Sequence, residues 1–195
     1  MNTKETDFSL FEKKIRSQTV FSGTLLEVKK DHVTLPDGRE SAREWIEHPG
    51  ASAVLPVFES GEVQLVKQFR YPVGENFLEV PAGKIDAGED PLVTAKRELK
   101  EEAGIRGYHW ASLGLFHPSI GYTNEVIHLY VTWGLESFDN NADEDEFVKP
   151  VRLPFQVAID EVFRGGITDG KTMTNVLKAA KWWKEHHPFP IRLSF

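Results

Sequence analysis

The stretch from residue 83 to residue 105 holds the side chains best suited to chemistry, namely Arg97, Glu98, Glu101 and Glu102. In a helix, a turn of about 100° per residue places the three glutamates within one arc of about 100°. Like charges at this spacing destabilise a helix and raise one another's pKa unless cations lie between them. Magnesium meets that demand, because it takes carboxylate oxygens, keeps several waters and also binds substrate phosphate. The sequence therefore predicts a site for a hard divalent cation.

The residues that flank the glutamates predict where their helix begins and ends. Asp90 is a favourable N-cap, Pro91 suits the first helical position, and Gly104 suits the position just past the end. We therefore expect a helix from Pro91 to Ala103. Its apolar residues form a stripe that should pack inward, made of Leu92, Ala95, Leu99 and Ala103.

The spacing of this stretch resembles the signature of the Nudix hydrolases. The residues that match it are Gly83, Glu89, Arg97, Glu98, Leu99, Glu101, Glu102, Gly104 and Ile105. The alternative is a surface helix with an acidic face, but that alternative explains neither the two glycines nor the fixed spacing. The resemblance implies an α/β (α+β) fold, a Nudix α/β/α sandwich with a mixed sheet, and metal-dependent hydrolysis of a pyrophosphate bond.

For the metal site, the resemblance implies Mg²⁺, with Mn²⁺ as a possible substitute. We assign Glu98 and Glu102 as direct ligands and Glu101 as a ligand or a partner through water. The backbone carbonyl just before the signature glycine, which here belongs to Ala82, is also a metal ligand in this family. Two or three metals held between carboxylates can neutralise phosphate charge and position the attacking water.

Arg97 cannot bind a metal, because its guanidinium is a permanent cation. We expect it to hold a glutamate such as Glu89 in the correct rotamer, in support of catalysis. The resemblance places the general base on a loop downstream of the signature, where the matching residue is Glu146. Glu144 is a rival because the acidic run makes the register ambiguous, and the simplest alternative is a solvated acidic loop.

The resemblance covers roughly residues 20 to 180 and is similar to the ADP-ribose pyrophosphatase branch. The matching segments outside the signature are 66–72, 78–84 and 145–148. Arg70 could clamp a diphosphate or sugar phosphate with two hydrogen bonds, although by itself it could equally be a surface arginine. The resemblance implies that Glu79 contacts substrate or an ordered water of the metal site.

Aromatic residues are expected to bind the nucleobase. The branch places such residues on the N-terminal segment, where Trp45 lies with Arg43 nearby, and Phe21 could contribute from a partner subunit. The alternatives are cross-strand packing for Trp45 and dimer or core packing for Phe21.

The predicted reaction releases a nucleoside monophosphate and a sugar phosphate from a nucleoside-diphosphate sugar. Isoleucine at position 120 replaces a proline that many ADP-ribose hydrolases carry, so nucleoside-diphosphate hexoses fit as well as ADP-ribose does. A second hypothesis is a Nudix-fold module that senses a nucleotide without cleaving it, and a third is hydrolysis of another nucleoside diphosphate derivative. Every signature glutamate is present, which favours the enzyme.

The first fifty residues predict an antiparallel appendage. Its expected strands are Val20–Val28, His32–Leu35 and Arg43–His48. We expect residues 1–48 to serve dimerisation and base binding, and residues 49–195 to form the catalytic domain. Strands with so little core of their own should bury themselves on another surface, so we expect a homodimer with exchange of N-terminal strands.

Composition limits the remaining classes of function. The chain has 195 residues, no cysteine and a formal net charge of −7, and 40% of its residues are hydrophobic. The absence of cysteine excludes disulfides and thiolate sites. Acidic charge without a lysine or arginine cluster argues against a nucleic-acid partner. No apolar run has membrane-spanning length and the N-terminus lacks a signal-type apolar segment, so we expect no membrane partner and a cytoplasmic location.

Overall fold

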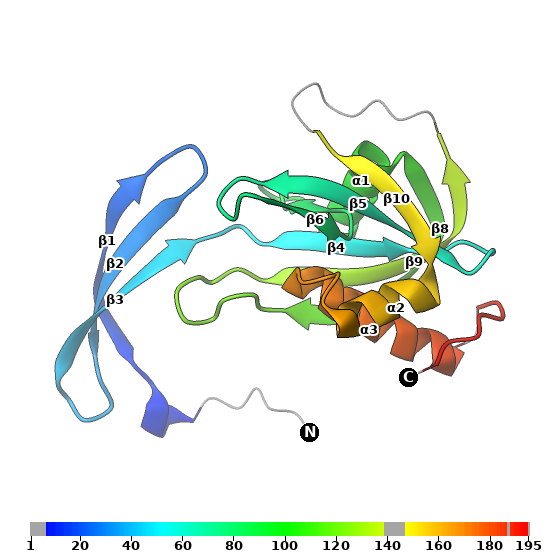
Figure 1. Ribbon diagram of the computed structural model, residues 1–195. Helices are drawn as coiled ribbons and strands as arrows, with labels where there is room; N and C mark the ends of the chain where they lie inside the picture. Colours follow the sequence, from blue (N-terminus) through cyan, green and yellow to red (C-terminus); the bar gives the residue numbers. More distant parts are fainter. Residues whose placement is uncertain (1–6, 139–146, 187, 195) are drawn as a thin grey trace. The chain divides into compact units, whose positions relative to one another are not determined.

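The computed structural model describes residues 7–138, 147–186 and 188–194 (Figure 1). None of the described helices is long and apolar enough to cross a membrane. After a short 3-10 helix at Phe8–Leu10, the elements in chain order are β1 (Lys13–Ser22), β2 (Glu27–Thr34), β3 (Glu40–Glu47), β4 (Ala51–Pro56), β5 (Glu62–Arg70), β6 (Glu75–Glu79), β7 (Ala82–Lys84), α1 (Pro91–Ala103), β8 (Ile105–Phe116), β9 (Ile127–Ser137), β10 (Lys149–Pro154), α2 (Phe155–Arg164) and α3 (Gly170–His186).

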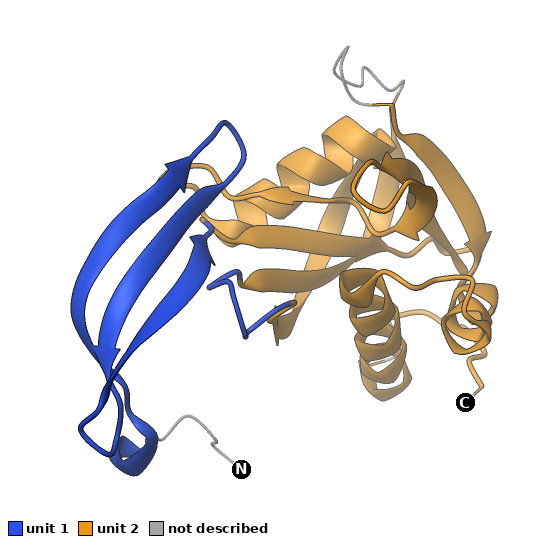
Figure 2. Cartoon of the chain, turned by 60° about the vertical axis from the view of Figure 1, so that its left-hand side comes forward, with its two compact units in different colours: residues 1–48, 119–125 blue, residues 49–118, 126–195 orange. Residues whose placement is uncertain are grey.

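The chain forms two compact units, which Figure 2 shows in different colours. Unit 1 comprises residues 1–48 and 119–125, and unit 2 comprises residues 49–118 and 126–195. Unit 1 is a three-stranded antiparallel sheet in the order β1-β2-β3. The segment 119–125 joins it at the end of β3, where the N–H of Ile46 donates to the carbonyl of Tyr122 over 2.8 Å.

One predicted strand in unit 1 is wrong. The segment from Val20 to Val28 is not one strand, because β1 ends at Ser22 and β2 begins at Glu27. Between them the chain turns, and the N–H of Gly23 donates to the carbonyl of Leu26 over 2.9 Å. The sequence suggested one strand because apolar residues continue from β1 through this turn into β2. The first part of β1 was missed because every residue of that strand is exposed and it shows no apolar alternation.

Unit 2 contains a four-stranded sheet in the order β7-β4-β9-β8. Strand β4 runs parallel to β9 and antiparallel to β7, so the sheet is mixed. Both faces of β4 are covered. Ala53 and Leu55 share a core with Val176 of α3, whereas Val54 packs with Leu99 of α1. Because alternate side chains point to opposite faces, β4 is buried along its whole length and lies between two helical layers.

The predicted limits of α1 are confirmed. Asp90 caps the helix by accepting a hydrogen bond from the N–H of Leu92 over 2.9 Å, and Pro91 is its first residue. At the other end Gly104 adopts the left-handed conformation, with φ of 65°. The buried side chain of Gln64 also donates to the carbonyl of Ala103 over 3.0 Å. Both ends of α1 are therefore fixed.

We predict that Gly104→Ala lowers the free energy of unfolding by about 1 kcal/mol, because a side chain in the left-handed region carries a steric cost of about that size. Urea denaturation of the pure protein measures the loss. Gly121→Ala is the matched control, since a Cβ at Gly121 would meet no atom within 4 Å and its φ lies outside the left-handed region. Equal stability of the two variants would contradict the prediction.

Candidate functional site

The three carboxylates predicted to bind metal lie on α1 and differ in burial. Glu98 and Glu102 are buried, with 8% and 5% of their surface exposed. The side chain of Glu101 is 40% exposed. The two buried glutamates face β7, as their contacts with that strand show. Strand β7 thus closes one side of the carboxylate cluster.

Strand β7 contacts the two buried glutamates directly. A Cβ at Gly83 would lie only 1.9 Å from Oε1 of Glu98, so no other residue fits there without displacing that carboxylate. One residue earlier, the N–H of Ala82 donates to Oε2 of Glu102 over 3.0 Å. The first glycine of the motif is therefore explained by close approach of the backbone to a carboxylate.

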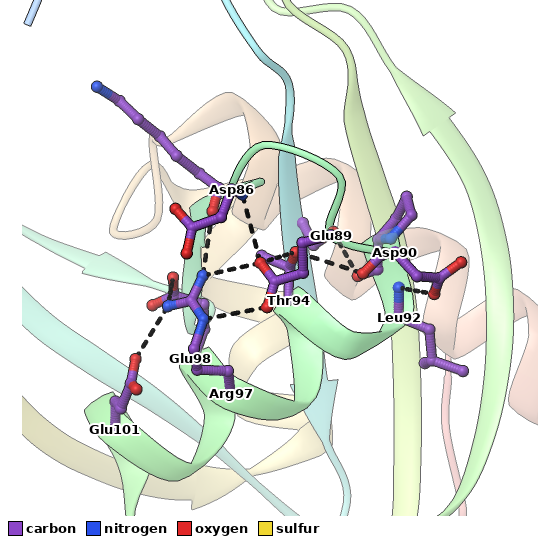
Figure 3. A network of polar contacts seen from close by, with 11 residues as sticks. Asp86, Glu89, Asp90, Leu92, Thr94, Arg97, Glu98 and Glu101 are labelled. Atoms are coloured by element: carbon purple, nitrogen blue, oxygen red, sulfur yellow. Dashed lines mark hydrogen bonds and ion pairs between the residues drawn. The ribbon is translucent and has the colours of Figure 1, made fainter.

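Arg97 links the carboxylates of the motif (Figure 3). Its Nη1 donates to Oε1 of Glu98 over 2.7 Å and to Oε2 of Glu101 over 3.0 Å. Its Nε and Nη2 donate to the two carboxylate oxygens of Glu89 over 3.3 and 3.2 Å. Nη2 also donates to the carbonyl of Lys84 over 3.2 Å. The predicted contact between Arg97 and Glu89 is thus confirmed.

The hydrogen bonds and charges in this network stabilise the ionised forms of Glu89 and Arg97. Hydrogen bonds from Arg97 and then from Thr94 lower the pKa of Glu89 to about 2. The hydrogen bond to Glu89, the nearby charge of Glu98 and the hydrogen bonds to Glu101 and Glu98 raise the pKa of Arg97 above its ordinary value. Glu89 and Arg97 therefore stay ionised at neutral pH, and Arg97 supplies part of the positive charge that the crowded carboxylates require.

The donor set suits a hard divalent cation. It combines three carboxylates and a neighbouring backbone carbonyl, which are the oxygen ligands that Mg²⁺ and similar ions take. Within the described ranges no three Asp, Glu or His side chains lie in positions that would hold one ion as they stand. Since Arg97 pairs with Glu98 and Glu101, a cation at this face would compete with that arginine for carboxylate oxygens.

A second charged group connects β5, β6 and α3. Arg70 donates through Nε and Nη2 to the two oxygens of Glu79, both over 2.7 Å. Lys171 also donates to Glu79 and, over 2.9 Å, to Asp169. Burial by itself would raise the pKa of Glu79, but Arg70 and Lys171 outweigh that effect and hold the pKa below its usual range.

This group borders a pocket of about 300 Å³ in unit 2. Its lining consists of Arg70, Pro72, Val73, Phe77, Glu79 and Asp169. Sequence reasoning selected Arg70 and Glu79 but missed Asp169 and Lys171. The available signal was the run Asp169-Gly-Lys-Thr172, because Asp169 caps α3 by accepting a hydrogen bond from the N–H of Thr172 over 3.0 Å.

The residues predicted to bind the base lie in unit 1. Arg43 forms two hydrogen bonds with Glu12, over 2.9 and 2.5 Å. Trp45 lies on β3 opposite Lys29, and Phe21 is 55% exposed at the end of β1. Their roles in base binding stay predictions. The two candidates for the general base, Glu146 and Glu144, lie outside the described residues.

Comparison with protein families gives a match over most of the chain. The family model for the NUDIX domain matches residues 46–175, which include the whole motif and both charged groups described above. A solved structure titled "Crystal structure of ADP compounds hydrolase" superposes with a TM-score of 0.79 and 21% sequence identity, and the match covers 91% of this chain and 97% of that one. This likeness confirms the fold that the sequence predicts.

Three characterised relatives are similar over most of their length. The methanol dehydrogenase activator of Bacillus methanolicus is 42% identical over 170 residues, which cover 86% of this chain and 92% of the relative. The ADP-ribose pyrophosphatase of Bacillus subtilis (strain 168) is 38% identical, with 84% and 90% covered. The GDP-mannose pyrophosphatase of Escherichia coli (strain SMS-3-5 / SECEC) is 30% identical, with 85% and 91% covered.

The lowered pKa of Glu89 predicts how its contribution to stability depends on pH. A carboxylate whose pKa is about 2 when folded and about 4.5 when unfolded stabilises the fold above pH 4.5, and this contribution is lost as the pH falls toward 2. We therefore expect Glu89→Gln to be less stable than the wild type at pH 6, with a smaller difference at pH 3. Urea denaturation at both pH values measures it. A difference that is constant or grows on acidification would contradict the assignment.

Proposed function

The chain belongs to the Nudix family of hydrolases, and from this premise we propose that it hydrolyses the pyrophosphate bond of nucleoside-diphosphate sugars. The products would be a nucleoside monophosphate and a sugar phosphate. The observation that carries the proposal is the carboxylate face of α1, closed by Gly83 and cross-linked by Arg97. The relatives named ADP-ribose pyrophosphatase and GDP-mannose pyrophosphatase support this substrate class.

Divalent cations, Mg²⁺ or Mn²⁺, are proposed to bind at this face. Glu98 and Glu102 would be ligands together with the carbonyl of Ala82, and Glu101 would bind directly or through water. When bound, such cations neutralise phosphate charge and make water a better nucleophile. Arg97 would keep Glu89, Glu98 and Glu101 in fixed rotamers, because its guanidinium spans all three.

The second charged group is proposed to bind the phosphates. The side chain of Arg70 is 45% exposed and borders the pocket of about 300 Å³. Two of its nitrogens donate to Glu79, and no described residue accepts a hydrogen bond from Nη1. Arg70 therefore has a donor and a positive charge to offer to a phosphate oxygen of the substrate.

A glutamate of the acidic segment that precedes β10 in the sequence is proposed to be the general base. Glu146 would accept a proton from the attacking water, and Arg70 would remain charged throughout. The proposed metal ligands lie on α1 and β7, whereas Glu146 lies in the sequence between β9 and β10.

A substrate screen tests the proposed reaction. Purified protein with Mg²⁺ is incubated with ADP-ribose, GDP-mannose, other nucleoside-diphosphate hexoses and a dinucleotide, and the products are separated by chromatography. The dinucleotide tests the third hypothesis, which is hydrolysis of another nucleoside diphosphate derivative. We expect a nucleoside monophosphate from at least one nucleoside-diphosphate sugar. Turnover of the dinucleotide alone, or of none of these compounds, would overturn the substrate class.

We predict that Glu102→Gln lowers kcat about 100-fold or more without unfolding the protein, and that EDTA abolishes activity of the wild type. Loss of a residue that only hydrogen-bonds to a metal ligand already lowers metal affinity or activity about 10- to 100-fold. Loss of a ligand itself should therefore lower kcat at least as much. Steady-state kinetics measure the change. Glu185→Gln is the matched control, because Glu185 lies on α3 and pairs with Lys181. Full turnover of Glu102→Gln, or of the wild type in excess chelator, would contradict the proposed metal site.

The identity of the general base is tested by a pair of variants. If Glu146 accepts the proton, Glu146→Gln should lower kcat by about 10²- to 10⁴-fold with little change in substrate affinity. Glu144→Gln should retain most of the activity. The opposite pattern in single-turnover kinetics would assign the base to Glu144.

A homodimer is proposed from the exposed apolar side chains of unit 1. They are Ile15, Val20, Phe21, Leu25 and Leu26, and each is at least 41% exposed. A three-stranded sheet that buries so little needs another surface to cover it, and a second copy of the chain supplies one.

Sedimentation equilibrium is predicted to give twice the chain mass of 22.1 kDa. Phe21→Asp should shift the protein toward the monomer, because a charge would replace an apolar group in the interface. Arg39→Asp is the control, since Arg39 lies in the exposed turn after β2. A monomeric wild type would refute the proposal.

A further inference from the structure

Glu79 is a buried carboxylate that two cations share. Its side chain is only 3% exposed. Arg70 donates to both of its oxygens, and Lys171 donates to Oε2. A buried carboxylate is costly unless its charge is compensated by an adjacent cation and by hydrogen bonds. Glu79 therefore needs at least one of these cations beside it at all times.

Arg70 and Lys171 differ in burial and in the number of carboxylates that they contact. The side chain of Arg70 is 45% exposed, and it lies at the end of β5 beside the pocket. The side chain of Lys171 is 14% exposed and also donates to Asp169 over 2.9 Å. Lys171 is thus held between two carboxylates, whereas Arg70 contacts one carboxylate and solvent.

The surroundings of Lys171 are tied to the strand that carries Glu79. Asp169 accepts hydrogen bonds from the N–H and the hydroxyl of Thr172, over 3.0 and 2.6 Å. The hydroxyl of Thr172 in turn accepts from the N–H of Val80 over 2.9 Å, and Val80 directly follows Glu79. The start of α3 and the end of β6 therefore hold Lys171 in a fixed place relative to Glu79.

We propose that Lys171 is a positioning residue, which stays on Glu79 as its fixed counter-charge so that Arg70 can leave Glu79 and bind a phosphate of the substrate with two nitrogens rather than with Nη1 alone. This inference rests on the proposed function. With Lys171 present, the departure of Arg70 leaves Glu79 paired with one cation. Without Lys171, the same movement leaves an isolated buried carboxylate, so Arg70 stays on Glu79 and the substrate binds more weakly.

A purely structural role of Lys171 predicts a different effect of its removal on stability and kinetics. If Lys171 only joins α3 to β6, its removal lowers thermal stability and leaves the kinetic constants of the folded fraction unchanged. If Lys171 allows Arg70 to leave Glu79, removal of Lys171 raises KM instead. The free-energy cost of leaving Glu79 without a counter-charge then opposes substrate binding. The two roles therefore separate in the comparison of KM, kcat and melting temperature.

The experiment uses the full chain and the best substrate from the screen. Lys171→Met is expected to raise KM about 10-fold, equivalent to about 1.4 kcal/mol, with kcat within about 3-fold of the wild type. Lys171→Gln keeps a hydrogen-bond donor without charge, and it is expected to behave like Lys171→Met. Lys171→Arg keeps the charge and is expected to restore KM to within about 3-fold. Lys181→Met is the control, because Lys181 lies exposed on α3 and pairs with Glu185.

A double-mutant cycle with Glu79→Gln tests whether Lys171 acts through Glu79. A neutral glutamine needs no counter-charge, so Lys171→Met should change KM less than about 2-fold in that background. Effects that multiply in the double variant would show independent action and overturn the inference. A KM unchanged in Lys171→Met and Lys171→Gln, with or without a lower melting temperature, would also overturn it. Absence of turnover by the wild type would overturn the proposed function itself, which is a separate result.

Discussion

Repulsion among carboxylates on one face of α1 is the constraint that organises the structure around it. Glu101 and Glu102 lie one turn of helix after Glu98, and Glu98 and Glu102 are buried. Such a face is stable only when positive charge and hydrogen-bond donors surround it. Arg97 supplies the charge and the N–H of Ala82 supplies a donor, so the protein holds three carboxylates together in advance of any ligand.

The rest of unit 2 keeps that face in place. Strand β4 lies between α1 and α3, and β7 pairs with β4 and approaches α1 so closely that a side chain at position 83 would displace the carboxylate of Glu98. The second charged group binds α3 to the end of β6 by the same principle, a buried carboxylate compensated by cations from other elements. Both charged groups therefore depend on packing that brings distant segments together.

Structural features that depend only on residues close in the sequence, such as the ends of α1, were predicted from local signals. The limits of α1 follow from Asp90, Pro91 and Gly104, whose effects act within one turn. The hairpin between β1 and β2 was misplaced because apolar residues continue on both sides of its turn, and β1 lacks a buried face that would produce alternation.

Contacts across long stretches of chain could not be predicted in this way. Lys171 lies 92 residues after Glu79, and nothing in either segment specifies the other. Motif spacing selected Gly83 and Glu98, but it did not show that the backbone of one meets the carboxylate of the other. The resemblance supplied the residues of the site, while the fold supplied their partners.

The carboxylate face of α1 is proposed to bind divalent cations, and direct titration with Mn²⁺ followed by electron paramagnetic resonance tests this binding without any substrate. We expect bound Mn²⁺ in the wild type, loss of that binding in Glu98→Gln, and displacement of Mn²⁺ by excess Mg²⁺. Equal binding of Mn²⁺ by the wild type and by Glu98→Gln, or none by the wild type, would contradict it.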